Sequence, residues 1–307
     1  MADLKVDFGK FQLKNPVMTA SGTFGYGLEY AQFYDISKLG AIMVKGIRSV
    51  PSDGNPTPRV AEVTGGMLNA IGLQGPGVEK FLHDDHYLPG VKKTGAAIIV
   101  NIWGKTAEEY ADVAARLEAE AKEDIAALEI NISCPNVKEG GAAFGTDLKL
   151  AAAVVREVRK NTTIPLITKL SPNVTKITDF AKAAVDEGSD MLSLINTIGG
   201  MAIDIETHRP KLANVCGGLS GPAVKPVAIK MVYEVAKAVS VPIIGMGGIM
   251  SAEDAIEFMI AGASMVAVGT ANFVDPYAAI KILDGINEYL DKHNIAKAAD
   301  IVGSVKL

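Results

Sequence analysis

Short apolar runs alternate with amphipathic segments along most of this chain. Eight runs rich in strand-forming residues predict β-strands over residues 17–20, 41–45, 97–102, 126–132, 165–170, 191–196, 241–245 and 264–268. Helical apolar spacing marks residues 106–121, 148–160, 177–187, 223–239, 252–261 and 276–290. Ahead of this repeat, residues 4–6 and 11–13 predict a small β-hairpin.

Eight strands that alternate with helices are typical of either an open doubly wound sheet or a closed barrel. The strands are evenly apolar and end in polar residues or glycine, which favours an α/β fold of the (β/α)₈ (TIM) barrel type. Two connections, residues 46–93 and 197–223, are longer than the others, and both follow the C-terminal end of a strand. We therefore expect residues 1–307 to form a single barrel domain, with long βα loops over its C-terminal face.

Composition narrows the class of function. The 307 residues carry a net charge of −5 and no dense basic cluster, so neither nucleic acid nor an anionic membrane surface is an expected partner. The N-terminal residues alternate between polar and apolar and lack the apolar core of a signal peptide or membrane span, which makes the cytoplasm the expected location. The two cysteines, Cys134 and Cys216, are too few for an iron–sulfur cluster, which normally takes four.

Polar residues and glycines follow the predicted strands where each strand ends. In chain order they are Ser21, Lys45, Asn101, Asn131 with Cys134, Lys169, Asn196 with Thr197, Gly247 with Gly248, and Gly269 with Thr270. One Asn at a strand end is typical of a turn. Three Asn and two Lys at equivalent positions indicate a polar ligand, because burying an unpaired amide or ammonium is costly.

The last two strands end in glycine-containing sequences, GMGGI (245–249) and VGTA (268–271), and each precedes a helical segment. Either loop alone could simply form a tight βα turn. Both together, on adjacent strands, predict a phosphate site, because the free N–H groups of a helix's first turn bind anions.

Cys134 follows a buried strand and begins a glycine-rich segment, residues 135–145, that has the pattern of a lid loop. Cysteine is often a small buried apolar residue. A thiol ionises at about pH 8.5, however, close enough to neutrality to serve as a base. A nucleophilic role would need a histidine partner, and none of the four histidines follows a predicted strand. We interpret Cys216 as structural.

Lys169 emerges from an apolar run, and three interpretations are open. It could pair with a neighbouring carboxylate at the rim, form a Schiff base, or act as a fixed cation where negative charge develops. Lys45 presents the same choice.

Nine stretches of the chain together resemble the dihydroorotate dehydrogenases, specifically the catalytic subunit of class 1B. They are NPVMTASGTFGYG (15–27), VKGI (44–47), NAIGLQGPG (69–77), EINISCPN (129–136), ITKLSPN (167–173), INT (195–197), GGLSGPA (217–223), GMGGI and VGTA. This resemblance implies an FMN-binding barrel that oxidises dihydroorotate to orotate in pyrimidine biosynthesis.

The same resemblance implies roles for individual residues. Cys134 would be the catalytic base that removes the C5 proton while the C6 hydride passes to N5 of FMN. The implied substrate-binding residues are Lys45, Asn69, Ala70, Ile71, Gly72, Leu73, Asn131, Asn196 and Thr197. The implied FMN-binding residues are Ser21, Lys45, Gly46, Asn101, Asn131, Lys169, Ile195, Gly221, Gly247, Gly248, Gly269 and Thr270. No metal ligand is implied.

The class of the family sets the electron acceptor. Class 2 members use serine as the base and carry an N-terminal membrane-associated extension, neither of which we expect here. The GLQGPG turn (72–77) and residues 15–27 look like class 1B. That class implies a partner subunit that holds FAD and a [2Fe–2S] cluster and reduces NAD⁺, in a heterotetramer that contains a homodimer of this chain.

Three alternatives stand beside this interpretation. One is a fumarate-dependent homodimeric enzyme of class 1A. The second is an aldolase-type barrel that forms a Schiff base through Lys169, which would leave Cys134 without a role. The third is a non-catalytic barrel that binds a phosphorylated ligand.

Overall fold

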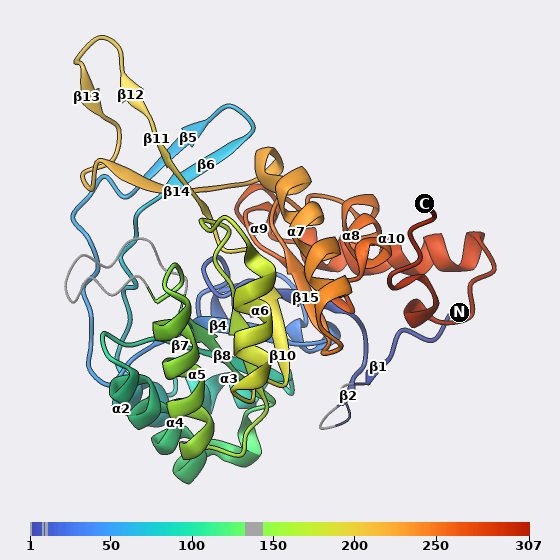
Figure 1. Ribbon diagram of the computed structural model, residues 1–307, viewed down its shortest axis with the longest axis horizontal. Coiled ribbons are helices and arrows are strands. Elements are labelled where there is room, and N and C mark those ends of the chain that lie inside the picture. The colour runs from blue at the N-terminus through green and yellow to red at the C-terminus, as the bar shows by residue number, and fades with distance from the viewer. Residues whose placement is uncertain (1, 8, 10–11, 133–143) are drawn as a thin grey trace.

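Eight parallel strands form the central sheet of the computed structural model, which describes residues 2–7, 9, 12–132 and 144–307 (Figure 1). The strand order is β3-β16-β15-β10-β9-β8-β7-β4. A parallel bridge between Met18 and Ala41 joins the two edges of this sheet, so the strands enclose a barrel. The strands are β3 (Val17–Thr19), β4 (Ile42–Ile47), β7 (Ile98–Ile102), β8 (Ala127–Asn131), β9 (Leu166–Lys169), β10 (Met191–Leu194), β15 (Ile243–Met246) and β16 (Met265–Val268).

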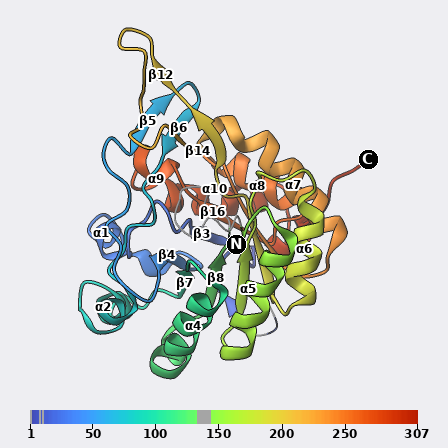
Figure 2. The same cartoon turned by 60° about the vertical axis from the view of Figure 1, so that its left-hand side comes forward.

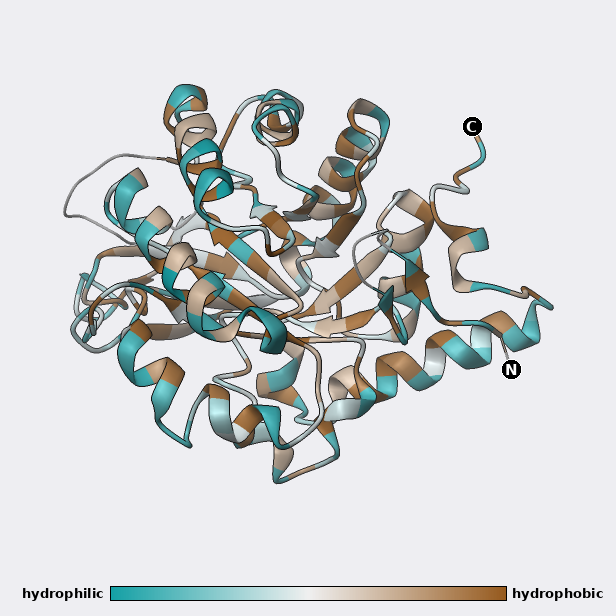
Figure 3. Ribbon diagram, turned by 90° about the horizontal axis from the view of Figure 1, so that it is seen from below, coloured by the Kyte–Doolittle hydropathy of each residue, from teal (hydrophilic) through white to brown (hydrophobic). Residues whose placement is uncertain are grey.

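Helices surround this barrel and connect consecutive strands. The longer ones are α4 (Ala107–Ala121), α5 (Leu148–Asn161), α6 (Ile177–Asp186), α7 (Lys225–Ala238), α8 (Ala252–Ala261) and α10 (Ala278–Lys292). Shorter helices are α1 (Leu28–Ala31), α2 (Val78–His83), α3 (Leu88–Lys92) and α9 (Ala271–Val274), with 3₁₀ turns η1 (Ile36–Lys38), η2 (Lys122–Asp124), η3 (Pro222–Val224) and η4 (Ala298–Ile301). Apolar and polar residues alternate along the outer helices, as amphipathic packing requires (Figure 3).

The predicted barrel is confirmed, because each of the eight predicted strands overlaps one strand of the sheet and each of the six predicted helices overlaps one outer helix. Boundaries differ by a few residues: β4 continues to Ile47, and α10 runs from Ala278 to Lys292. The N-terminal hairpin also forms, as β1 (Val6–Asp7) paired with β2 (Gln12–Leu13).

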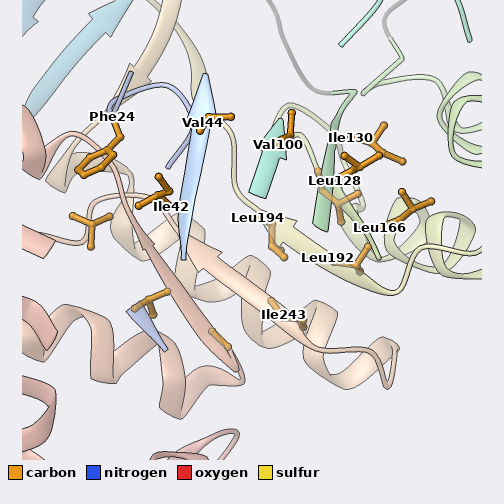
Figure 4. Packing of buried hydrophobic residues seen from close by; sticks show 14 of the residues in the cluster. Phe24, Ile42, Val44, Val100, Leu128, Ile130, Leu166, Leu192, Leu194 and Ile243 are labelled. Atoms are coloured by element: carbon orange, nitrogen blue, oxygen red, sulfur yellow. The ribbon is translucent and has the colours of Figure 1, made fainter. Parts of the chain in front are cut away.

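The two faces of each barrel strand have different neighbours. Leu128 and Ile130 of β8 point outward into the large apolar layer beneath the helices, which Figure 4 shows together with Val100, Leu166 and Leu192. The lower interior holds a separate apolar cluster: Leu13, Met18, Ala41, Met43, Ile99, Ala127, Ile167, Met191, Ile244, Met246, Met265 and Ala267. Side chains alternate between the two faces of a strand. The next inward-facing residues along each strand therefore lie above this cluster, toward the C-terminal ends of the strands.

The two long connections pair with each other, which the sequence analysis did not predict. They contribute β5 (Val60–Val63), β6 (Gly66–Asn69), β11 (Ile198–Met201) and β14 (Cys216–Ser220) to an antiparallel sheet of order β11-β14-β6-β5. A further hairpin, β12 (Ile203–Asp204) with β13 (Arg209–Pro210), extends from it. Figures 1 and 2 show this sheet standing beyond one end of the barrel. Cys216 is exposed on it, so our structural interpretation of that residue has no support in core packing.

No helix within the described ranges is both long and apolar enough to cross a membrane.

Glu118 of α4 ties its helix to the start of β9. Its carboxylate accepts hydrogen bonds from the backbone N–H groups of Thr163 (2.8 Å) and Ile164 (3.2 Å) and from the hydroxyls of Thr162 and Thr163 (both 2.8 Å). Burial raises the pKa of Glu118, but these hydrogen bonds and Lys122 outweigh it and lower the pKa to about 2.

We predict that Glu118→Gln lowers the free energy of unfolding by about 1 kcal/mol at pH 7, because neutral Gln is a weaker acceptor for these donors. The folded-state pKa lies below the unfolded value of 4.5, so the wild-type advantage is complete above about pH 5 and is lost as pH falls toward 2. Urea titrations of both proteins between pH 7 and pH 3 measure this difference. A difference that does not depend on pH would contradict the ionic origin.

Gly245 of β15 packs directly against α8. A Cβ at this position would lie 2.6 Å from Cδ1 of Phe258 and 3.0 Å from Cβ of Ala263, both fully buried. We predict that Gly245→Ala lowers the free energy of unfolding by about 1–3 kcal/mol, because the ring cannot move without disturbing the core. Gly199→Ala is the matched control, since its Cβ would meet no atom closer than 3.6 Å. Equal urea midpoints for the two variants would refute the close-packing argument.

Candidate active site

A layer of polar side chains lies above the apolar interior of the barrel. The inward series of β8 runs Ala127, Glu129, Asn131, and the register pairs Glu129 with Ile167 and Asn131 with Lys169 of β9. Asn101 of β7 lies beside Glu129 in the same layer. Four of these polar side chains (Asn101, Glu129, Asn131 and Lys169) are buried, with exposed fractions of 6% or less. Polar groups at this depth need partners, because solvation is lost.

Glu129 is the centre of the lower part of this layer. Its Oε2 accepts a hydrogen bond from Nδ2 of Asn101 at 2.5 Å, and its Oε1 accepts one from Oγ of Ser193 at 2.6 Å. Nζ of Lys169 lies 3.7 Å from Oε2. The fully buried carboxylate is held by hydrogen bonds from β7 and β10 and by an ion pair with β9.

Amide side chains continue this network toward the barrel mouth. Nδ2 of Asn131 donates to Oδ1 of Asn101 at 3.4 Å, and Nδ2 of Asn196 donates to Oδ1 of Asn131 at 3.5 Å. Oδ1 of Asn196 accepts from the backbone N–H of Thr197 at 2.8 Å. The three Asn that the sequence placed at strand ends therefore lie in one connected chain.

A cavity of about 910 Å³ opens above this layer at the C-terminal ends of the strands. The residues expected at the site that line it are Ser21, Lys45, Gly46, Asn69, Ile71, Gly72, Leu73, Asn101, Asn131, Lys169, Ile195, Asn196, Thr197, Gly247, Gly248, Gly269 and Thr270. Ala70 and Gly221 are not part of the lining. Ala70 is fully buried behind the turn, and its carbonyl accepts from Nδ2 of Asn55.

Glycines of β15 and β16 shape one end of this cavity. Gly247 and Gly248 have positive φ angles of 124° and 80°. A Cβ on Gly248 would lie 2.8 Å from the carbonyl oxygen of Gly221 and 3.0 Å from the backbone N of Lys225, so only glycine fits there. Thr270 follows β16 on the neighbouring strand, and its hydroxyl donates to Oγ of Ser220 at 2.8 Å. This end has the close backbone approach that phosphate sites need.

The small sheet of the long connections forms a side wall of the cavity that begins beside the glycine end. Register places Asn69 of β6 beside Gly218 of β14, and Nδ2 of Asn69 donates to the Gly218 carbonyl at 3.4 Å. The turn after β6 follows, with positive φ angles at Gly72 (77°) and Leu73 (55°). This wall therefore adds an amide and a turn's backbone to the groups delivered by the barrel strands.

An aromatic and charged rim also lines the cavity and was not predicted. It includes Tyr26, Tyr30, Arg59, Tyr87 and Phe273. Tyr26 packs edge-on against Tyr87, with ring centroids 4.6 Å apart. Burial raises the pKa of the Tyr26 hydroxyl, and Tyr87 and Glu29 raise it further, so the group stays protonated at neutral pH.

Glu129 is the most informative residue that sequence reasoning did not single out. A signal was present: in the run ALEIN a charged residue lies two positions before Asn131, which puts both on the same face of a strand. His83 and His86 are exposed on or beside α2.

The remaining expected site feature, Cys134 with residues 135–143 of the predicted lid, lies outside the described residues. Its attachment point is described: β8 ends at Asn131, whose carbonyl accepts from the Tyr110 hydroxyl at 2.8 Å. Within the described ranges no group of three or more His, Cys, Asp or Glu residues could hold a metal ion.

Taken together, the cavity offers a glycine end suited to an anion, two lysines and a chain of amides that can both donate and accept. Such a set can bind a large polar ligand at one end and a small polar ring at the other.

Comparisons with known proteins agree on one family. A family model described as dihydroorotate dehydrogenase matches residues 3–290. The protein named dihydroorotate dehydrogenase B (NAD(+)), catalytic subunit, from Geobacter sp. (strain M21) is 54% identical over 305 residues, 99% of each chain. The protein of the same name from Lachnoclostridium phytofermentans is 56% identical over 293 residues, 95% of this chain and 96% of its own length.

A solved structure supports the architecture. The crystal structure of DHODH in complex with ferulenol from Eimeria tenella is similar with a TM-score of 0.78, covering 98% of this chain and 88% of its own. Its sequence identity is 23%, so it supports the fold alone.

Proposed function

The chain belongs to the dihydroorotate dehydrogenase family, and we propose that it is the catalytic subunit of an FMN-dependent enzyme that oxidises dihydroorotate to orotate and passes the electrons to NAD⁺ through a partner subunit. The observation that carries the proposal is the connected layer of Asn101, Asn131, Asn196 and Lys169 at the base of a cavity whose other end is a glycine cradle.

The residues present fit FMN. Gly247 and Gly248, which have positive φ angles, line one end of the cavity together with Gly269 and Thr270, and backbone N–H groups in turns of this kind suit a phosphate. Lys169 would hold a positive charge close to the isoalloxazine ring, and a fixed cation there would stabilise the negative charge that develops on reduction. The other residues proposed to line the cofactor are Ser21, Lys45, Gly46, Asn101, Asn131 and Ile195, with Gly221 contributing from behind the cradle. When bound, FMN supplies the hydride acceptor.

The remaining polar groups suit dihydroorotate, a ring with amide N–H and carbonyl groups and one carboxylate. Asn131, Asn196 and Thr197 would bind the ring's donors and acceptors, since amides offer both. Lys45 and Asn69, with the backbone of residues 70–73, would hold the carboxylate. Orientation by several fixed groups places C5 and C6 for reaction, which is a large part of catalysis in such transfers.

We assign the base to Cys134. It lies three residues after Asn131, the last residue of β8 and itself a proposed substrate ligand. As a thiolate it would take the C5 proton, which is acidic because it is α to a carbonyl, while C6 loses hydride. The proposed lid would exclude water during this step.

The Schiff-base alternative has little support. The family model and the relatives at 54–56% identity are described as dihydroorotate dehydrogenases, and an aldolase-type barrel would leave Cys134 without a role. The class 1A alternative is not favoured either, because the relatives at 54–56% identity bear the NAD(+) name.

We further propose the partner and setting. The relatives' name, catalytic subunit, implies a separate electron-transfer subunit. We propose that this subunit holds FAD and a [2Fe–2S] cluster, in a heterotetramer with a homodimer of this chain in the cytoplasm. Two cysteines in this chain are consistent with a cluster held elsewhere.

The cofactor and the electron acceptor can be tested on the purified chain. We expect the purified chain to be yellow, to release close to one FMN per chain, and to be bleached by dihydroorotate without oxygen. With its electron-transfer subunit present, NAD⁺ and not fumarate should sustain turnover. A colourless protein that borohydride traps on a carbonyl substrate would instead support the Schiff-base barrel.

The role of Cys134 as the base can be tested by substitution. Cys134→Ala should abolish FMN reduction by dihydroorotate and leave FMN bound, because it removes the base and not the phosphate cradle. Cys134→Ser should retain slow reduction that increases with pH, since a hydroxyl is a far weaker acid than a thiol. Stopped-flow absorbance measures both.

Cys216→Ala is the matched control, because this cysteine is exposed on β14. It should reduce FMN at the wild-type rate. Normal reduction in Cys134→Ala, or a flat pH profile in Cys134→Ser, would remove Cys134 from the role of base.

A further inference from the structure

Glu129 is fully buried in the barrel interior, and the reaction proposed above gives it no task. A buried carboxylate is expensive unless several donors compensate for lost water. Its retention beneath the site therefore calls for a physical explanation.

The donors around Glu129 leave it purely an acceptor. An amide N–H of Asn101, the hydroxyl of Ser193 and the ammonium of Lys169 converge on its two oxygens from β7, β10 and β9. An ionised carboxylate has only acceptor sites, so this surrounding matches the charged form. Glu129 and Lys169 thus form a buried pair whose charges cancel.

We propose that Glu129 is a positioning residue that sets the donor and acceptor sense of the substrate-binding amides and limits the positive field of Lys169 at the flavin. The inference deepens the proposed function, because it takes FMN and dihydroorotate as the ligands above this layer.

The amide part follows from the order of the network. Asn101 turns Nδ2 to Glu129, so its Oδ1 faces Asn131. Asn131 must then turn Nδ2 downward and present Oδ1 to Asn196. Each Asn could otherwise rotate its amide by 180°. A carboxylate at the base cannot donate and the backbone N–H of Thr197 cannot accept, so the two ends of the chain impose the same sense on the amides between them.

The electrostatic part follows from the 3.7 Å separation of Nζ and Oε2. An uncompensated buried ammonium beneath a flavin would strongly favour its reduced, more negative form. The nearby carboxylate weakens that preference, so electrons remain easier to pass on. A residue of purely structural importance would change stability without changing this preference.

The experiment compares three variants that keep bound FMN. Glu129→Gln keeps the shape and removes the charge, Glu129→Asp keeps the charge, and Thr168→Val alters a buried polar group whose hydroxyl instead contacts Ser189. The readouts are FMN content, the midpoint potential of bound FMN, and the dissociation constant of orotate.

For Glu129→Gln we expect the ratio of the affinity for reduced FMN to the affinity for oxidised FMN to increase at least tenfold. This corresponds to a rise of about 30 mV in the midpoint potential of a two-electron couple. Orotate should bind at least tenfold more weakly, because Gln can donate and no longer fixes the amide sense. Glu129→Asp should keep the wild-type potential, and Thr168→Val should match wild type in both measurements. An unchanged potential in Glu129→Gln, or an equal shift in Glu129→Asp, overturns the proposal.

Glu129→Gln could lose FMN or fail to fold, because Lys169 would be left buried without its counter-charge. The double variant Glu129→Gln with Lys169→Met then decides, since it removes both charges. Restored folding in the double variant supports the paired role, and a double variant that folds no better than Glu129→Gln overturns it. If wild type itself holds no FMN, the proposed function fails, whereas a normal wild type with unresponsive variants removes only this inference.

Discussion

Closure of the barrel is the constraint on which this structure depends. Once the eight strands meet, the inward side chains have no route to water except the mouth, and period-two alternation fixes which residues they are. The lower positions are filled by methionine, isoleucine and alanine, which need no partner. The positions above them are polar and must satisfy one another or a ligand. The candidate site lies at the C-terminal end of the barrel interior, where the inward-facing residues change from apolar to polar.

The second element of the design is the sheet made by the two long connections. These segments are more than 100 residues apart in the chain, yet β6 pairs with β14 and brings Asn69 alongside Gly218. Backbone hydrogen bonds between two loops convert them into a wall, and a wall can hold a turn such as Gly72–Leu73 in an unusual conformation. The barrel strands contribute the polar side chains at the base of the cavity, and this sheet contributes one of its side walls.

Much of this could be predicted from the sequence, and the failures have physical causes. The barrel strands are apolar and flanked by helical patterns, so local signals identified them. The strands of the small sheet have four or five residues, like many barrel strands, but no helical pattern flanks each of them, and pairing between distant loops leaves no local period to detect. Most expected site residues line one cavity because parallel strands end at one face. Ala70 does not, because the turn that contains it directs its small side chain into the core.

Glu129 shows what pattern reading tends to overlook. Polar side chains at strand ends have an evident use in ligand binding, whereas a carboxylate one layer deeper has the sequence pattern of an ordinary strand residue. Its contacts show that depth matters as much as position, since a group that no ligand touches can still decide how the ligand-binding amides are turned. The effect of the charge on Lys169 likewise depends on the residue beneath it. Lys169 alone would be a strong cation in a low-dielectric interior, but paired with Glu129 it adds a local dipole and no net charge. The field at the base of the cavity is therefore a property of the pair, and a role assigned to Lys169 by itself describes half of the interaction.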